Sequence, residues 1–199
     1  MIRFYLNREL SETLDIRLSR WKRWSREFLP PDPLGGMQSG YARQYTLEQA
    51  FTVYVGGHLV SDLKFSVHEA KQIMGDLGAW LREQSGLHLM DDNTDSHKID
   101  RNAASYSTVF IFRKLSADNS VVVFTYLERI RISDEAYEFD GADARREVYS
   151  ERWIPGASTN TSRNRHAERA PDPASVEKID GKIVYITDLY KRFASKVKV

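Results

Sequence analysis

Hydrophobic positions in the first third of the chain recur at helical spacing. Leu6, Leu10 and Leu14 repeat every four residues with polar residues between them, which predicts an amphipathic helix of about eight to ten residues. Asp15 marks a turn after this helix. The chain is therefore expected to begin with a short helix that packs through its leucines.

A second helical run follows and combines aromatic with basic positions. Its aromatic side consists of Trp21, Trp24 and Phe28. Ser19 is the expected N-cap, because its hydroxyl can accept a hydrogen bond from an amide in the first turn. The helix should end before Pro30, because the prolines there lack an amide donor and disfavour helical geometry in the residue before them.

Thr46 and Ser66 are the expected N-caps of two further helices. The expected buried face of the third helix consists of Leu47, Ala50, Phe51, Tyr54 and Val55. Its far end is left open by Gly56 and Gly57, which weaken a helix. The expected buried face of the fourth helix consists of Val67, Ala70, Ile73, Met74, Leu77, Trp80 and Leu81. This helix should end near Gly86.

The second half of the chain changes to the pattern of β-strands. Residues 109–111 and 121–124 are rich in β-branched and aromatic side chains, with turn residues at 117–119 between them. This order predicts two long strands in a hairpin. Weaker strands are expected at 137–139 and 148–154.

Two further elements are expected near the C-terminus. Asp180 and Gly181 lie between two apolar runs, which predicts a hairpin turn. A helix from Asp188 to about Lys196 is expected to place Leu189 and Phe193 against the sheet. The C-terminal half should therefore be α+β with a mainly antiparallel sheet and a C-terminal helix.

The length of 199 residues is sufficient for two small domains. Residues 85–105 are polar and rich in Asp, Asn and Ser, which favours a linker. The expected organisation is a helical domain over residues 1–84, this linker, and an α+β domain over residues 106–199. Within the second domain, residues 156–173 have the composition of a flexible loop.

Composition restricts the kinds of function that fit the chain. The formal net charge is +1 and the pI is near 7.9, so a nucleic-acid site would have to be a local patch. The absence of cysteine excludes disulfides, thiolate nucleophiles and Cys-ligated zinc. No secretory signal pattern and no run of about 20 apolar residues occurs, so we expect a cytoplasmic protein without a membrane partner.

The second helical run contains a dense group of cations without an acid between them. These cations are Arg17, Arg20, Lys22, Arg23 and Arg26. Arginine and lysine can bind phosphate oxygens or guanine edges. The alternative is a solvated basic face with no ligand.

Residues 3–80 as a whole resemble the DNA-binding domain of the MerR family, a winged helix-turn-helix. The matching segments are residues 10–14, 16–24, 28–30, 43–46 and 63–70. Arg-Gln-Tyr-Thr at 43–46 is similar to the family's Arg-x-Tyr-Ser/Thr at the end of the wing. Leu-Lys-Phe-Ser-Val-His-Glu-Ala at 63–70 is similar to its Leu-Gly-Phe-Ser-Leu-Glu-Glu-Ile.

The resemblance implies that the second helix enters the major groove and that the wing holds the flanking backbone. The DNA-binding residues that it implies are Arg17, Arg20, Lys22 and Arg23 on the helix, Arg43 at the wing, and Tyr41 and Lys64 as additional candidates. For Trp24, Tyr45 and Phe65, packing in the core is the preferred interpretation.

The chain departs from the family pattern at two places. Asp15 stands where a turn glycine is common. No sustained heptad pattern follows the fourth helix, where the family has its dimerisation helix. The resemblance therefore does not imply the family's dimer, although a homodimer stays open. The apolar strand residues of the second half could cover either an internal core or a partner.

Two other clusters of polar side chains could bind a metal ion or phosphate, but each also has a simpler explanation. His88 and His97 flank Asp91, Asp92 and Asp95 and could ligate a divalent metal, but a polar linker accounts for the same residues. Arg163, Arg165, His166 and Arg169 form a basic cluster that we interpret as part of a solvated loop. No phosphate-binding loop, zinc-protease motif or nucleophile elbow occurs, so neither an enzyme nor a cofactor is expected.

Two hypotheses about function follow from the sequence. The first is a bacterial-type transcriptional regulator that binds double-stranded DNA through its basic helix and wing, with a second domain for ligand sensing or oligomerisation. The alternative is a protein-interaction module that uses the winged helix as a docking surface. The alternative predicts that the cations of the helix face Asp or Glu from elsewhere in the structure.

Overall fold

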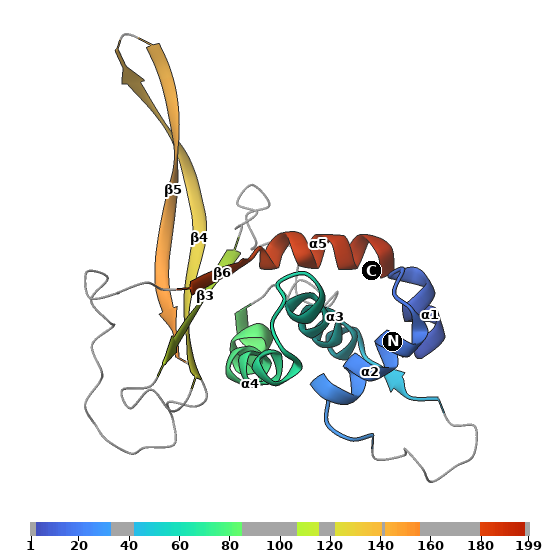
Figure 1. Ribbon diagram of the computed structural model, residues 1–199. Coiled ribbons are helices and arrows are strands. Elements are labelled where there is room, and N and C mark those ends of the chain that lie inside the picture. The colour runs from blue at the N-terminus through green and yellow to red at the C-terminus, as the bar shows by residue number, and fades with distance from the viewer. Residues whose placement is uncertain are drawn as a thin grey trace. The chain divides into compact units, whose positions relative to one another are not determined.

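The computed structural model describes residues 3–32, 42–84, 107–115, 122–140, 142–155 and 180–197. It is an α+β structure with four N-terminal helices, a four-stranded antiparallel sheet and a C-terminal helix (Figure 1). Its contacts divide it into two compact units, residues 1–78 with 189–199, and residues 79–188. The predicted division into a domain over residues 1–84, a linker over 85–105 and a domain over 106–199 stays a prediction.

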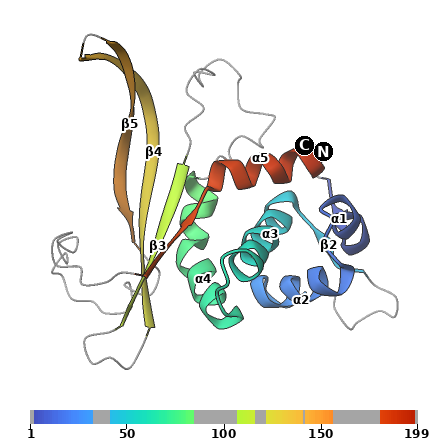
Figure 2. The same ribbon diagram turned by 45° about the horizontal axis from the view of Figure 1, so that its top comes forward.

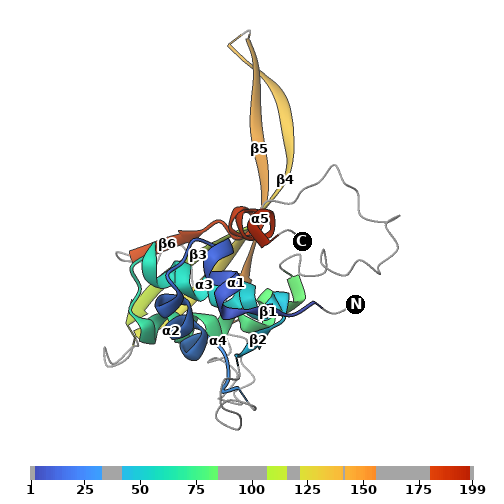
Figure 3. The same cartoon turned by 90° about the vertical axis from the view of Figure 1, so that its right-hand side faces the viewer.

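The first unit contains two short strands and the helices that surround them. In chain order these elements are β1 (Tyr5–Leu6), α1 (Asn7–Thr13), α2 (Leu18–Phe28), β2 (Gln44–Tyr45), α3 (Leu47–Ser61) and α4 (Val67–Gln84). The helix α4 belongs to this unit up to residue 78, and its last residues, 79–84, belong to the second unit. The two strands pair antiparallel, Tyr5 opposite Tyr45 and Leu6 opposite Gln44 (Figure 3). This pairing joins the start of the chain to the residues that follow the loop after α2.

Two of the three predicted helix caps are confirmed. Thr46 Oγ1 accepts a hydrogen bond from the Gln49 amide at 3.2 Å, and Ser66 Oγ accepts one from the Glu69 amide at 3.2 Å. The predicted cap Ser19 is wrong, because α2 begins at Leu18 with Arg17 as its N-cap. No side chain caps α2, so the local capping preference of serine did not decide where the helix starts.

The helix α3 continues through the two glycines that left its end open in the sequence. A Cβ atom added at Gly57 would lie 2.3 Å from the Trp24 ring, and one added at Gly56 would lie 2.5 Å from the Phe28 ring. The two glycines therefore let α2 pack closely on α3. Their role here is close approach between helices, whereas the sequence indicated only a weakened helix.

Two turns of the first unit place residues other than glycine in the left-handed region of the backbone. Asp15, between α1 and α2, has φ 56°, and Lys64, between α3 and α4, has φ 60°. A side chain in this conformation usually costs about 1–2 kcal/mol, although Asp and Asn tolerate it better. Both turns therefore have the geometry that glycine adopts without strain.

We expect the substitution Lys64→Gly to raise the free energy of unfolding by about 0.5–1 kcal/mol. Relief of the left-handed strain outweighs the larger entropy of glycine in the unfolded chain. Thermal melting followed by circular dichroism would measure the change. Asp15→Gly is the matched control, with a smaller expected gain, and a melting temperature of Lys64→Gly at or below that of the wild type would contradict the prediction.

The second unit is built on one sheet with the strand order β5-β4-β3-β6. Its strands are β3 (Ser107–Leu115), β4 (Val122–Phe139), β5 (Ala142–Ile154) and β6 (Asp180–Val184), and every pairing is antiparallel. The predicted pairing of the first two strands is confirmed. Val109 and Ile111 are 0% and 1% exposed, so they belong to an internal core.

The strands β4 and β5 are longer than the sequence pattern indicated. They pair as far as Phe139 opposite Ala142, whereas the pairing of β3 with β4 covers β4 only from Val122 to Ile130. Beyond that point β4 and β5 form a two-stranded ribbon (Figures 1 and 3). Residues 132–138 of this ribbon are exposed and mostly polar, so the alternation that reveals a half-buried strand is absent there.

The predicted hairpin turn at Asp180 and Gly181 is wrong. Both residues belong to β6, where Asp180 pairs with Arg113 and Gly181 pairs with Phe112 of β3. A Cβ atom added at Gly181 would lie 3.2 Å from the Phe112 ring. This glycine therefore accommodates a neighbouring aromatic ring within the sheet.

The helix α5 (Ile186–Val197) is present, but from Leu189 onward it belongs to the first unit rather than packing on the sheet as predicted. Phe193 contacts Phe51 and Tyr54 of α3, with ring centroids 5.3 Å and 5.5 Å apart, and Tyr190 contacts Phe51 at 5.4 Å. Figure 2 shows α5 beside α3. The apolar stripe of α5 thus completes the helical core.

Several predictions lie outside the described residues. They concern Tyr41, most of the wing, the turn at 117–119, the linker at 85–105, the loop at 156–173, and the clusters around His88 and His166. Among the helices that are described, none has the length and apolar character needed to cross a membrane.

Candidate nucleic-acid interface

The helix α2 has a sharply divided surface. Trp21, Trp24 and Ser25 are buried on one side, with Trp21 fully inaccessible. All five cations lie on the exposed remainder. The aromatic side attaches the helix to the core, as the sequence predicted, and leaves the basic side open to a ligand.

Neither the N-cap Arg17 nor any of the four cations of α2 forms an ion pair with another described residue. Other cations of the same unit do, for example Arg3 with Glu9 at 3.1 Å. The single acid of α2, Glu27, pairs with Lys71 of α4 at 3.3 Å instead of with a cation of its own helix. The described surface of α2 therefore keeps its positive charge uncompensated.

Arg20 differs from the other cations in its position on the helix. Its guanidinium carbon lies 5.9 Å from the centroid of the Trp24 ring, which is within the range of a cation–π contact. Arg20 therefore lies at the edge of the exposed face, next to the buried aromatic side. Lys22 and Arg26 are one turn apart on the side that faces the start of α1.

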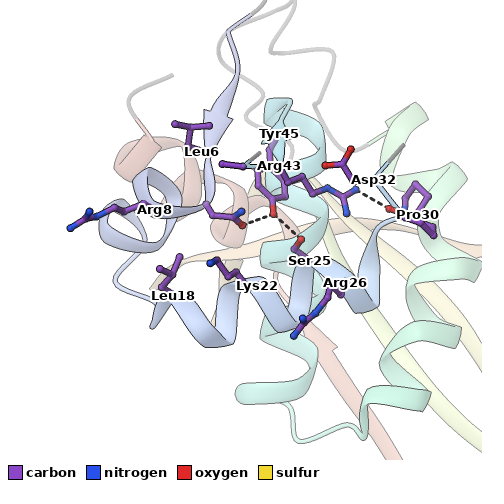
Figure 4. Close-up of a pocket in the computed structure, with 13 residues that line it drawn as sticks. Leu6, Arg8, Leu18, Lys22, Ser25, Arg26, Pro30, Asp32, Arg43 and Tyr45 are labelled. Atoms are coloured by element: carbon purple, nitrogen blue, oxygen red, sulfur yellow. Dashed lines mark hydrogen bonds between the residues drawn. The ribbon is translucent and has the colours of Figure 1, made fainter. Parts of the chain in front are cut away.

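An open groove of about 770 Å³ runs along that side of α2 (Figure 4). Its basic lining is Arg8, Lys22, Arg26 and Arg43, and its apolar lining includes Leu6, Leu18, Pro30, Pro31 and Ala42. Among the described residues that line the groove, the acidic one is Asp32. The sequence-based set of DNA-binding residues omitted Arg26 and Arg8, although the i, i+4 spacing of Lys22 and Arg26 could have revealed the former.

Tyr45 fixes the geometry at the back of the groove. Its hydroxyl donates a hydrogen bond to Asn7 Oδ1 at 2.6 Å and accepts one from Ser25 Oγ at 2.7 Å. Burial raises the pKa of this hydroxyl above its usual value of 10.0, although the Ser25 hydrogen bond and the charge of Arg43 oppose the shift. Tyr45 is fully buried, so it joins β2, α1 and α2 as core, as predicted.

Arg43 connects the end of the loop after α2 to the exit of that helix. It donates a hydrogen bond to the Pro30 carbonyl at 2.9 Å, and its guanidinium lies 5.6 Å from the centroid of the Tyr45 ring. Arg43 thus lines the groove together with the cations of α2. Because part of its hydrogen-bonding capacity is used within the chain, it also positions the base of the loop.

Lys64 is not brought to this groove in the described structure. Its ammonium donates a hydrogen bond to the Ser61 carbonyl at the end of α3, which accounts for its orientation. Of the predicted site residues, Lys22 and Arg43 line the groove. Arg17, Arg20 and Arg23 are exposed at the start of α2 and along it, but they do not line the groove.

The described residues contain no group of three or more His, Asp or Glu side chains arranged to hold a metal ion. Comparisons of the chain with protein families, with curated proteins and with solved structures give no match. The function is therefore inferred from the basic face, which we define as Arg17, Arg20, Lys22, Arg23 and Arg26, and from the groove beside it.

Proposed function

We propose that the protein is a DNA-binding transcriptional regulator that binds duplex DNA through α2 and the adjoining groove. The observation that carries the proposal is the uncompensated charge of α2 and its N-cap Arg17: within the described residues their five cations are exposed and none is ion-paired. Phosphate oxygens supply the missing negative charge, and arginine can also read guanine edges. A helix of this kind, held rigidly on a core, suits the major groove.

The arrangement around α2 supports its interpretation as the second helix of a winged helix-turn-helix like that of the MerR family. A short helix and a tight turn precede α2, and the next described element after it is β2, which Arg43 directly precedes. The turns at Asp15 and Lys64 adopt left-handed conformations at the two positions where the family pattern has glycine. In this proposal the loop is the wing, and the second unit serves sensing or oligomerisation.

The docking-module alternative is less well supported. It expects acids from elsewhere in the structure to face the α2 cations. Asp32 lines the groove with Lys22 and Arg26, but within the described residues no cation of α2 forms an ion pair. Two arginines of the β4–β5 ribbon behave differently, because Arg131 pairs with Asp134 and Arg146 pairs with Glu135, each at 2.6–2.7 Å. An isolated set of unpaired cations on α2 favours an external polyanion.

The double variant Arg20→Ala/Arg23→Ala tests the proposal. We expect it to weaken binding to mixed-sequence duplex DNA about tenfold and to reduce the slope of log K against log salt by about 1.8, because each lost phosphate contact removes about 0.9. Fluorescence anisotropy at several salt concentrations would measure both quantities.

Arg146→Ala is the matched control for this experiment, since Arg146 is an exposed arginine of the second unit that already has an ion-pair partner. It should bind as the wild type does. Equal affinity and equal salt slope for the wild type and the α2 double variant would refute the DNA proposal, and a partner protein retained after nuclease treatment would then support the docking module.

A further inference from the structure

Leu18 is an apolar side chain in a groove lined by Arg8, Lys22, Arg26 and Arg43. It is the first residue of α2, follows the N-cap Arg17, and is 37% exposed. Trp21 and Trp24 already attach this helix to the core. A single exposed leucine needs no explanation by itself, so its surroundings decide whether it has a role.

The groove beside α2 gives Leu18 a defined environment. Leu18 and Lys22 are one helical turn apart and both line the groove, and Arg26 follows one turn later (Figure 4). On α2 itself, the apolar Leu18 is followed in the lining by Lys22 and Arg26, whereas Pro30, Pro31 and Asp32 belong to the segment after the helix. A ligand that fits this order presents a small apolar group at the start of the helix and negative charge farther along.

Duplex DNA has this combination of groups in its major groove. Thymine is the natural base that carries a methyl group on its major-groove edge, and apolar side chains contact that methyl. In a helix-turn-helix, the N-terminal residues of the second helix reach the base edges. The position of Leu18 matches the base-reading end, while Lys22 and Arg26 lie where phosphates would pass.

We propose that Leu18 is a specificity-determining residue that packs against the C5 methyl of a thymine. The inference rests on the proposed DNA-binding function and adds to it a preference for thymine at one position of the bound duplex. Burial of one methyl group contributes about 0.8 kcal/mol, which corresponds to about a fourfold change in affinity. The contact adds sequence preference, whereas the cations supply most of the affinity.

The experiment begins with selection of binding sites from a randomised duplex pool by the full-length protein. Each selected duplex is then prepared with thymine or with deoxyuridine, which pairs identically and lacks the methyl. We expect the wild type to bind the thymine form about fourfold more tightly for each contacted thymine. Leu18→Ala should bind both forms equally, with unchanged salt dependence and circular dichroism.

Ile132→Ala is the control, because Ile132 is an exposed apolar residue of the second unit, 58% accessible; it should keep the thymine preference. Equal binding of the two forms by the wild type, or a preference retained in Leu18→Ala, would overturn the inference while leaving DNA binding intact. A pool that yields no enriched duplex, or an Arg20→Ala/Arg23→Ala variant that binds normally, would overturn the proposed function as well.

Discussion

Replacing Gly57 by alanine should lower the free energy of unfolding by about 2–3 kcal/mol. The new methyl group would lie 2.3 Å from the Trp24 ring, well inside van der Waals contact. Trp24 is only 7% exposed and its rigid ring is held between α2 and the core, so the helices must separate. Overpacking of this kind costs about 1–3 kcal/mol or more, which outweighs the higher helix propensity of alanine.

Gly75→Ala is the matched control for this substitution. Gly75 also lies inside a helix, α4, but a Cβ atom there would meet nothing within 4 Å. The control should therefore gain about 0.5–1 kcal/mol from helix propensity alone. Urea denaturation followed by circular dichroism would measure both variants, and a Gly57→Ala protein as stable as Gly75→Ala would show that α2 and α3 are not in close contact.

The Gly57 variant also connects packing to function. If the separation of α2 from α3 moves the basic face, DNA affinity should fall in Gly57→Ala although no cation has been changed. Positioning of the second helix on a rigid core is what allows its side chains to reach the bases in register. Loss of stability with unchanged affinity would indicate that α2 tolerates displacement.

Features that depend on neighbouring residues in the chain were predictable. Thr46 and Ser66 cap their helices through hydrogen bonds to amides three residues away, and this spacing is visible in the sequence. The alternation of buried and basic positions on α2 is similarly local, so Trp21, Trp24 and the cations were assigned correctly to opposite sides.

Features that depend on distant parts of the chain were not predictable. In the sequence, Gly181 resembles a turn residue and Gly57 resembles a helix breaker. Only the structure shows that each glycine leaves room for an aromatic ring, that of Phe112 at Gly181 and that of Trp24 at Gly57. The amphipathic pattern of α5 shows that one side is buried, but it does not specify the partner. The structure places Phe193 on Phe51 of α3 rather than on the sheet.

The candidate site shows the same division. Its cations could be found from composition and helical spacing, but its groove could not, because the walls come from separate segments. Asn7 and Tyr45 are joined by a hydrogen bond across 38 positions of the chain, and Arg43 reaches the carbonyl of Pro30 across 13. Only the folded chain places Leu18 and Lys22 beside these residues.

Glu128 is expected to be the most important single polar side chain of the second unit, and Glu128→Ala should lower the free energy of unfolding by about 3 kcal/mol. Its carboxylate is 2% exposed and accepts hydrogen bonds from Ser107 Oγ at 2.9 Å, from Trp80 Nε1 at 3.3 Å and from Arg152. The three donors come from β3, α4 and β5. Alanine would leave the buried Trp80 and the half-buried Ser107 without this acceptor and would break the ion pair to Arg152.

Glu151→Ala provides the comparison for Glu128→Ala on a neighbouring strand. Glu151 pairs with Arg129 at 2.6 Å, but both side chains are about two-fifths exposed, so removal should cost at most about 0.5 kcal/mol. Thermal and urea unfolding of both variants would compare the buried carboxylate of Glu128 with the exposed carboxylate of Glu151. Equal stability of the two variants would contradict the conclusion that Glu128 holds the end of α4 to the sheet. Because Glu128 lies outside the basic face, DNA binding by the folded Glu128→Ala protein should be unchanged.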